Sequence, residues 1–393
     1  MRILVVASWF CPAFEFGGPA RVLYEIFRRL ATRGHEVSVY TTDVLDAQNR
    51  YVPKSNPEDI EGMQVYRFPN VSHYLAHEQL IFIAPRMRAM LREHLGEYDV
   101  ALFHCFYTLH NVWASSAALA HDVPFVVEPA GSLPPTRTPW RSLPKHIFLR
   151  TWGQSLIRSA ARFVAVSQEE RARQVEWGVP SEKINVIANG VSLSELDAEI
   201  APGQFRDQWG VGRDRPLVLF AGRLSPIKGI DLLLRAFARQ DEDAVLVIAG
   251  PDATGYGQQL QAMADDLGIS NRTIFTGMLT RDQVLAACSD ADVFVLASRD
   301  EGHPVALVEA CGMGSSVIAT EACNMPEITE WGAGRVIRTE DWPALADALA
   351  ELLADEPLRR RQGERGREMV KELFTWERAA EMYESCLAEA AGT

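Results

Sequence analysis

Short apolar runs that alternate with helix-like patterns limit most strongly how this chain can fold. Runs that are apolar on both faces are typical of strands buried on both sides, as in a parallel sheet covered by helices. Amphipathic stretches separate most of the runs. In the first half of the chain these runs are Ile3–Ala7, Val37–Tyr40, Val100–Phe103, Phe125–Val127, Phe163–Val166 and Val186–Ile187.

The same alternation starts again after a loop-like stretch at residues 200–215. The length of 393 residues also fits two domains better than one. We therefore predict an α/β chain with one doubly wound domain at 1–199, a linker at 200–215 and a second domain at 216–374. A last helical pattern, at residues 375–393, is expected to cross back to the first domain. The apolar runs of the second half are Leu217–Phe220, Val245–Ala249, Thr273–Thr276, Val293–Leu296 and Val317–Ala319.

The charge balance argues against nucleic acid as a partner. The net charge is −13, whereas a nucleic-acid binder needs a basic surface to displace counterions from phosphates. Residues 1–197 hold 20 basic and 20 acidic residues, so the whole acidic excess lies in the remainder. This asymmetry fits two domains with different partners, and it also fits an acidic surface that is merely solvated.

No signal for secretion, membrane insertion or disulfides is visible. No apolar run reaches the roughly 18 residues of a spanning helix, and the start of the chain has no small-residue cleavage site, so we expect a cytoplasmic protein. The six cysteines are spread singly, without a CxxC pair or a cysteine–histidine cluster. They predict reduced thiols and no structural zinc site.

Ligands of open parallel sheets bind beyond the carboxyl ends of the strands, so the loops there are the first place to look for a site. After the first strand, Gly17 and Gly18 precede a helical pattern and Pro19 suits its first turn. A glycine pair lets the backbone approach a ligand without interference from Cβ. An ordinary turn between strand and helix is the alternative.

The corresponding loop of the second domain, Ala221–Gly229, carries two cations. Arg223 and Lys228 are separated by a turn with Pro226 and lie between a strand and a helix. Both can converge beside a helix N-terminus. A bidentate guanidinium and a mobile ammonium would together neutralise a diphosphate.

The segment Glu301–Gly312 gives the sharpest signal. Glu309 interrupts an apolar, helix-like run that should face the core, where an unpaired carboxylate is costly. It therefore needs a partner, and a ribose diol would supply two hydroxyl donors. Glu301, on the loop before this helix, would face the group carried on the diphosphate.

This combination resembles the retaining glycosyltransferases of the GT-B fold, family GT4, over most of the chain. The motifs are the Gly17-Gly18 pair, Gly222-Arg223-Leu224 with Lys228-Gly229, Asn189-Gly190-Val191, Gly250-Pro251-Asp252, Glu128–Leu133, Cys323–Glu327 and the two glutamates Glu301 and Glu309. The resemblance implies two Rossmann-like domains that face each other across a cleft. Two positions depart from the family pattern: His303 stands where an aromatic residue is common, and Ala130 where histidine or arginine is frequent.

The resemblance also implies roles for individual residues. Arg223 and Lys228 would hold the donor diphosphate, and Glu309 the ribose. Glu301 would contact the donor sugar or phosphate, and His104 would lie beside the donor sugar. The implied catalytic residues are Arg223, Lys228, Glu301 and His104; the implied donor-binding residues are Gly17, Gly18, Gly222, Gly250, Met278, His303, Pro304, Val305 and Glu309; the implied acceptor-side residues are Arg21, Glu128 and Gly131.

The expected enzyme transfers a hexose from a UDP- or GDP-sugar to a sugar or a lipid-linked sugar, with retention, in cell-surface polysaccharide or glycoconjugate synthesis. Two cations on the protein make a metal unnecessary, and no cofactor is expected. No Asp-x-Asp metal motif stands at a donor-site loop. Asp241-Glu242-Asp243 and Asp290-Ala291-Asp292 flank strands and are expected to be solvated turn residues.

Other interpretations stay open at this point. A nucleotide-sugar epimerase on the same architecture and a non-catalytic nucleotide-sugar-binding protein would share the donor site. A nicotinamide dehydrogenase is a weaker alternative, because Gly312-x-Gly314 lacks the third glycine and ends a helix pattern. The basic and aromatic segment Arg137–Arg162 could contact an anionic membrane peripherally, at the inner face, or could be a solvated helix face.

Overall fold

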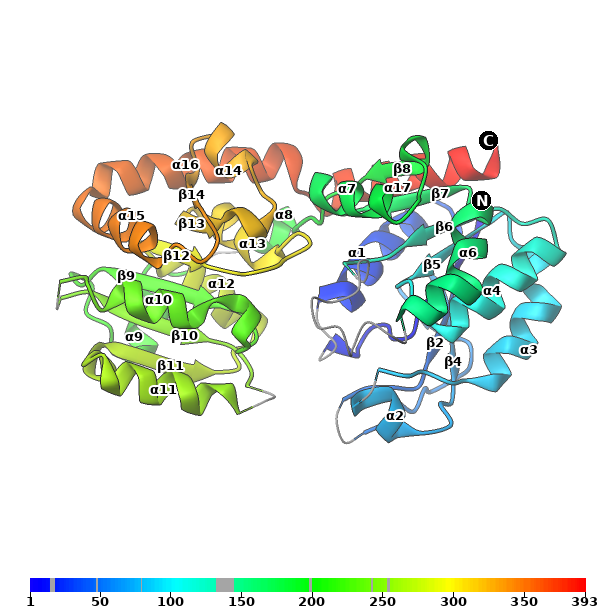
Figure 1. Cartoon of the computed structure of the whole chain (residues 1–393), viewed down its shortest axis with the longest axis horizontal. Coiled ribbons are helices and arrows are strands. Elements are labelled where there is room, and N and C mark those ends of the chain that lie inside the picture. Colours follow the sequence, from blue (N-terminus) through cyan, green and yellow to red (C-terminus); the bar gives the residue numbers. More distant parts are fainter. Residues whose placement is uncertain are drawn as a thin grey trace. The chain divides into compact units, whose positions relative to one another are not determined.

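The computed structural model describes residues 1–14, 18–46, 49–78, 80–131, 145–197, 200–241, 243–252 and 255–393. The chain divides into two compact units. The first contains Met1–Ala188 together with Trp376–Thr393, and the second contains Asn189–Thr375 (Figure 1). Each unit is an α/β structure built on a mainly parallel sheet, as predicted from the apolar runs.

The sheet of the first unit has the strand order β3-β4-β2-β1-β5-β6-β7-β8. The strand β1 lies between two parallel neighbours, with Ile3 opposite both Val37 and Val100. Its strands are β1 (Arg2–Val6), β2 (Glu36–Thr42), β3 (Glu58–Ile60), β4 (Met63–Phe68), β5 (Val100–His104), β6 (Phe125–Glu128), β7 (Arg162–Ala165) and β8 (Ile184–Val186).

The strands β3 and β4 were not predicted, and they pair antiparallel. Only Glu61 and Gly62 separate them, with φ of 50° and 85°. A two-residue turn with positive φ at both positions joins neighbouring antiparallel strands. The alternation of polar and apolar residues in β4 differs from the continuous apolar runs of the central strands, which is why periodicity missed it.

Helices cover both faces of this sheet. One face packs with α1 and α17 around Ile3, Phe27 and Tyr383, and the other packs with α3 and α4 around Phe103 and Phe125. The C-terminal helix α17 lies in the first unit and contacts α1, β5 and β6 (Figure 1). The helices are α1 (Gly18–Thr32), α2 (His73–Glu78), α3 (Pro85–His94), α4 (Leu109–Ala120), α6 (Gln154–Ser159), α7 (Gln168–Glu176) and α17 (Trp376–Ala391).

The sheet of the second unit is parallel throughout, with the order β11-β10-β9-β12-β13-β14. The strands β9, β10, β12 and β13 are fully buried, which explains why the first three are apolar throughout and why β13 is apolar at Val317–Ala319. The strands are β9 (Leu217–Ala221), β10 (Val245–Ala249), β11 (Thr273–Gly277), β12 (Val293–Leu296), β13 (Ser316–Thr320) and β14 (Gly334–Ile337).

The helices of the second unit flank its sheet (Figure 1). Among them α10 packs against α15, and α13 packs against α16. They are α8 (Leu193–Leu196), α9 (Gln204–Trp209), α10 (Ile230–Phe237), α11 (Tyr256–Asp266), α12 (Arg281–Asp290), α13 (Val305–Met313), α14 (Glu327–Glu330), α15 (Trp342–Ala354) and α16 (Glu356–Leu373).

The segment predicted as a linker at 200–215 is packed into the second unit, and the structure divides the chain earlier, at Ala188. Within the segment, α9 begins where the carboxylate of Asp290 accepts backbone N–H bonds from Gly203 and Phe205 at 2.7 and 2.9 Å. Arg206 donates to Asp292 at 2.8 Å. The expectation that Asp290 and Asp292 are solvated turn residues was therefore wrong.

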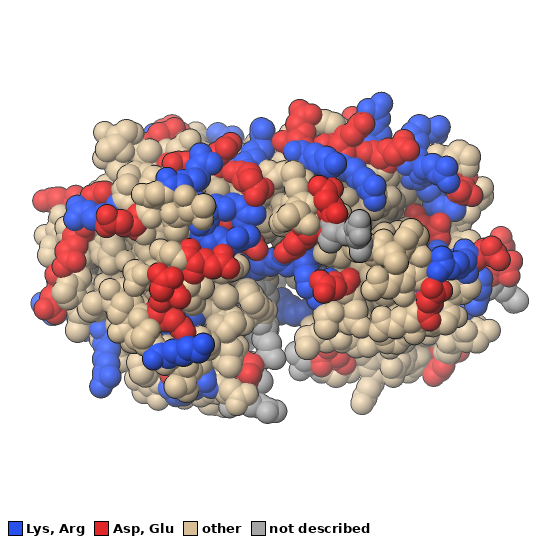
Figure 2. All heavy atoms as spheres, turned by 180° about the vertical axis from the view of Figure 1, so that it is seen from behind, with Lys and Arg blue, Asp and Glu red and all other residues tan. Residues whose placement is uncertain are grey.

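Charged side chains of both signs are interspersed on the face shown in Figure 2. Among the helices of the described residues, none combines the length and the apolar character that crossing a bilayer requires.

Candidate functional site

The second unit offers its most favourable ligand position between β9 and β12. In a doubly wound sheet, ligands bind beyond the carboxyl ends of the strands where the strand order reverses. The order β11-β10-β9-β12-β13-β14 reverses between β9 and β12. The loop after β9 carries Arg223 and Lys228, and the loop after β12 carries Glu301. The predicted cations and carboxylate thus lie on the two loops that flank this point.

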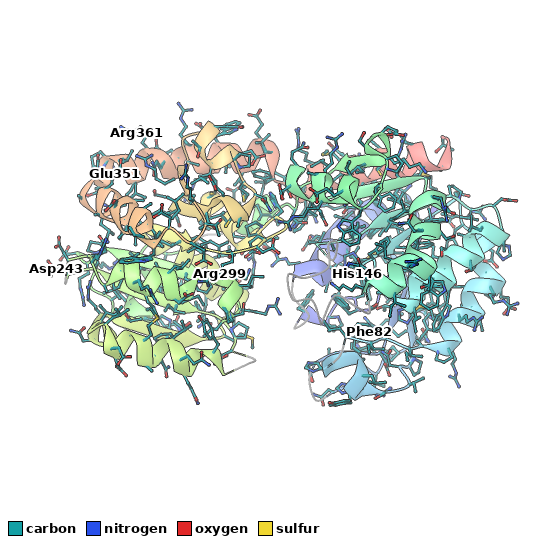
Figure 3. The ribbon with its side chains drawn as sticks, in the orientation of Figure 1. Phe82, His146, Asp243, Arg299, Glu351 and Arg361 are labelled. Carbon is teal, nitrogen blue, oxygen red and sulfur yellow. The ribbon has the colours of Figure 1, made fainter. Side chains whose placement is uncertain are left out.

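Backbone contacts hold these two loops against each other. Gly229 has φ of 64°, and a Cβ there would lie 1.9 Å from the carbonyl oxygen of Ala297, so a side chain would displace one loop. The backbone N–H of Arg299 donates to Ile227 O at 2.7 Å. The Arg299 guanidinium (labelled in Figure 3) also binds both carboxylate oxygens of Asp231 at 2.8 Å. The position of the Lys228 backbone therefore depends on the loop that carries Glu301.

Lys228 and Glu301 are in direct contact. The ammonium Nζ donates to Glu301 Oε1 at 2.5 Å, and the side chains are 20% and 13% exposed. The hydroxyl of Ser298, which is fully buried, donates to the same oxygen at 2.7 Å. The sequence predicted the lysine and the glutamate but not Ser298, since a lone serine at a strand end gives no signal.

The glycine residues predicted for the donor lie where loops approach closely. A Cβ on Gly250, which has φ of 143°, would lie 1.9 Å from Gly222 O, so the loops after β9 and β10 touch through their backbones. Arg223, the residue after Gly222, is exposed, and no hydrogen bond or ion pair joins it to another described residue. Met278 follows β11 and is 73% exposed. Arg223 and Met278 are thus available to a ligand at this edge.

Glu309 has a partner within the protein. It lies on α13, its residue is 6% exposed, and Arg281 Nη1 contacts Oε1. The same guanidinium donates to Glu195 Oε2 from Nη2 at 2.7 Å and from Nε at 3.1 Å. The sequence predicted that Glu309 needs a partner, but it did not indicate Arg281.

The ring of His303 is enclosed. It packs against Phe374 with 5.1 Å between ring centroids, and neither ring nitrogen has a hydrogen-bond partner among the described residues. Burial lowers the pKa of His303 to about 4. Its carbonyl accepts a bond from Asn189 Nδ2 at 3.0 Å. Pro304 and Val305 follow at the start of α13, the first buried and the second partly exposed.

In the first unit, two predicted residues meet at the ends of adjacent strands. His104 ends β5 and Glu128 ends β6, and the two residues are opposite each other in register. His104 Nδ1 lies 3.2 Å from Glu128 Oε2, and both residues are 1% exposed. Burial alone would lower the pKa of His104, but Cys105 and Glu128 raise it to about 10. His104 and Glu128 therefore form a buried pair, and within the described part of the chain His104 Nε2 has no hydrogen-bond partner.

The loop after β6 is held by a buried carboxylate that the sequence did not indicate. Glu170 Oε1 accepts the backbone N–H of Gly131 at 2.6 Å, and Oε2 accepts that of Val166 at 2.7 Å. Ala130 and Gly131 both have positive φ, 51° and 74°. The two bonds tie the loop that follows Glu128 and carries Gly131 to the end of β7.

The remaining predicted residues lie at the start of α1. Gly18 is the first residue of this helix, is exposed, and has open space where a Cβ would be. Arg21 lies three residues further along the same helix and is partly exposed. Gly17 lies outside the described residues.

The described part of the basic segment begins at Lys145. A π-helical turn, Leu149–Gly153, leads into α6. Phe148 packs on Phe106 and Tyr107, whereas Ile147 and Trp152 are 54% and 45% exposed. The segment thus turns one apolar face inward and leaves two apolar side chains in solvent.

Two family models match the chain. The model described as Glycosyltransferase Family 4 matches residues 16–195, and the model described as Glycosyl transferases group 1 matches residues 203–369. Together they cover the candidate residues of both units.

Curated relatives agree with these matches, and a solved structure shares the fold. A D-inositol 3-phosphate glycosyltransferase of Mycolicibacterium smegmatis is 26% identical over 87% of this chain and 80% of its own. A GDP-mannose-dependent alpha-(1-6)-phosphatidylinositol monomannoside mannosyltransferase of the same organism is 27% identical over 90% of each chain. HepE of Anabaena, solved with UDP and glucose, superposes with a TM-score of 0.78 over 99% of this chain and 100% of its own, at 21% identity.

Proposed function

Because this chain belongs to the glycosyltransferases of group 1 and family 4, we propose that it moves a sugar from a nucleoside-diphosphate sugar to an acceptor hydroxyl with retention of configuration. The observation that carries this proposal is the contact between Lys228 and Glu301 at the strand-order reversal of the second sheet. It places a cation suited to a departing diphosphate beside a carboxylate suited to sugar hydroxyls. The matching models describe transferases, so an epimerase and a non-catalytic binding protein lack support.

Lys228 and Arg223 act in this proposal on the leaving group. Negative charge on the diphosphate grows as the glycosidic bond breaks, and preorganised cations stabilise it more in the transition state than in the ground state. Arg223 is exposed and can form bidentate contacts with phosphate oxygens. Lys228 is held beside Glu301, so its ammonium is oriented before the donor binds. Two cations at this position make a metal ion unnecessary, and activity should persist in excess EDTA.

The other donor contacts follow from the same edge of the sheet. Glu309 accepts the ribose hydroxyls, and the exposed Met278 lies by the base. Gly222 and Gly250 let the backbone approach the donor. The enclosed ring of His303 leaves only its backbone, with those of Pro304 and Val305, to contact the donor.

For the first unit, the proposal assigns the backbone amide of the exposed Gly18 to phosphate binding, and Gly17 lies outside the described residues. In the same unit, the proposal assigns sugar binding to His104, which contacts Glu128, and acceptor binding to Arg21, Glu128 and Gly131. HepE is solved with UDP-glucose and the mannosyltransferase relative depends on GDP-mannose, which supports a UDP- or GDP-sugar here. The proposed acceptor is a sugar or lipid-linked sugar of cell-surface glycoconjugate synthesis, used in the cytoplasm.

A donor screen tests this proposal. Thermal melting is followed with UDP-, GDP- and ADP-sugars, since a ligand that binds only the native state raises its stability. The donor that stabilises most is then incubated with acceptors, with and without EDTA, and the anomeric proton of the product is read by NMR. We expect transfer with retained configuration in both arms. An inverted product would exclude retention, EDTA inactivation rescued by Mg²⁺ would exclude metal independence, and epimerised donor formed without acceptor would exclude transfer.

A further inference from the structure

Arg281 joins two carboxylates that belong to distant parts of the second unit. Nη1 contacts Glu309 of α13, while Nη2 and Nε contact Glu195 of α8 at 2.7 and 3.1 Å. All three guanidinium nitrogens are therefore engaged. The Arg281 side chain is 27% exposed and that of Glu309 is 8% exposed, so water screens this contact only in part.

The helix that carries Arg281 does not account for its position. Arg281 is the first residue of α12, where the helix dipole disfavours a cation. The free N–H groups of this end are served by a capping box of Thr280 and Gln283. The two carboxylates outweigh burial and raise the pKa of Arg281. The site around Glu309, rather than α12, thus explains why an arginine stands here.

The segment 189–196 contacts the Glu301–Gly312 motif at both ends. Asn189 Nδ2 donates to His303 O at 3.0 Å. Leu196 packs so closely on α13 that a Cβ on Gly312 would lie 2.5 Å from its Cδ1. Glu195, between them, reaches the motif through Arg281. Met278 lies in the loop that we propose to be beside the base, and Arg281 follows it by three positions, at the start of α12.

We infer that Arg281 is a positioning residue that holds the Glu309 carboxylate in the orientation that binds ribose, and that Glu195 fixes Arg281. This inference rests on the proposed function. A carboxylate has about four acceptor positions, so the contact from Arg281 to one oxygen leaves positions for two hydroxyls. Arg281 itself touches no ligand in this scheme.

The test compares a nucleotide with its analogue that lacks the ribose hydroxyls. The probes are the one of UDP, GDP and ADP that the parent binds most tightly, and its 2′,3′-dideoxy form, with Kd measured by calorimetry. Hydrogen bonds to a charged group predict that the parent prefers the ribonucleotide by roughly 10- to 100-fold. Substitution of a residue that acts through Glu309 changes the ratio of the two Kd values. Substitution of a residue that only stabilises the fold weakens the binding of both ligands by the same factor.

In Arg281→Met we expect the ratio to fall to the value of Glu309→Ala, near one. Arg281→Lys keeps the charge but loses the planar fork, so its ratio should be intermediate. Glu195→Gln should lower the ratio less than Arg281→Met does. The matched control is Arg335→Met, which breaks the half-exposed pair with Glu351 (labelled in Figure 3) and should leave the parent ratio unchanged.

A parent ratio retained in Arg281→Met would overturn the inference, as would an equal fall in the control. If Arg281→Met does not unfold cooperatively, the other two variants decide. The inference would then be overturned if Arg281→Lys and Glu195→Gln both prefer the ribonucleotide as strongly as the parent does. A different result would show that the proposed function itself is wrong. A parent that binds both probes equally would exclude the ribose role of Glu309 itself, and the role of Arg281 with it.

Discussion

Substitution of Lys228 distinguishes stabilisation of the leaving group from simple binding of the substrate by the second unit. Loss of one preorganised charge at a developing anion lowers kcat by roughly 10²–10³. We expect this loss in Lys228→Ala, with a smaller change in KM, because the charge on the diphosphate grows only in the transition state. Steady-state kinetics with the donor found by the screen measures it. Lys371→Ala, exposed on α16, is the control; unchanged kcat in Lys228→Ala would remove Lys228 from the catalytic residues.

The burial of His303 predicts that the stability of the second unit depends on pH. Burial lowers its pKa to about 4, whereas an unfolded histidine has a pKa of about 6.5. Between these values the unfolded state binds a proton that the native state does not, so the free energy of unfolding falls as the pH falls from 6.5 to 4. At 1.36 kcal/mol per pKa unit, the loss reaches about 3 kcal/mol.

We therefore expect His303→Phe to stabilise the second unit at pH 5 and to reduce its pH dependence. The phenyl ring fills the same space against Phe374 without the two buried nitrogens, to which no described residue is hydrogen-bonded. Hydrogen exchange of β13 at pH 7.5 and pH 5 measures the effect within this unit, and His146→Phe, an exposed position of the first unit, is the control. If the protection of β13 differs between pH 7.5 and pH 5 as much in His303→Phe as in the parent, His303 does not cause the pH dependence.

At the scale of elements, the turn between β9 and α10 couples backbone conformation to the site. Gly229→Ala adds a methyl group that meets Ala297 O at 1.9 Å, so the Lys228 loop must shift. Gly268→Ala is the matched control, because Gly268 has a similar φ of 69° but open space around a Cβ. Each variant should lose about 1 kcal/mol of stability to the left-handed conformation. Only Gly229→Ala should also lose kcat, and equal kinetics in the two variants would argue against this coupling.

At the scale of the whole molecule, the first unit depends on the last residues of the chain. Trp376, Tyr383 and Leu387 of α17 are buried in its core beside strands that begin at residue 2. Deletion of residues 376–393 should therefore remove hydrogen-exchange protection from β1 and β5, while β9 and β12 stay protected. Deletion of Gly392 and Thr393 alone is the control. Full protection of β1 in the long deletion would show that α17 is dispensable for this core.

Much of this molecule was predictable from local sequence. Strands buried on both faces of a parallel sheet are mostly apolar, so β1, β5, β9 and β12 contain continuous apolar runs. The loops that follow them in sequence reach the same edge of the sheet, which allowed Lys228 and Glu301 to be proposed together. The strands β4 and β14 escaped prediction, because β4 alternates polar with apolar residues and β14 is only partly buried.

The tertiary structure alone decided the contacts between side chains that are far apart in sequence. Arg281 and Glu309 are remote from Glu195, and no periodicity or spacing relates them; only the packing of α8, α12 and α13 brings them together. The same holds for Glu170, which fixes the loop at Gly131. A local pattern records which face of an element is apolar. The partner of a buried charge is chosen by the whole fold, since any segment that reaches the charge can neutralise it.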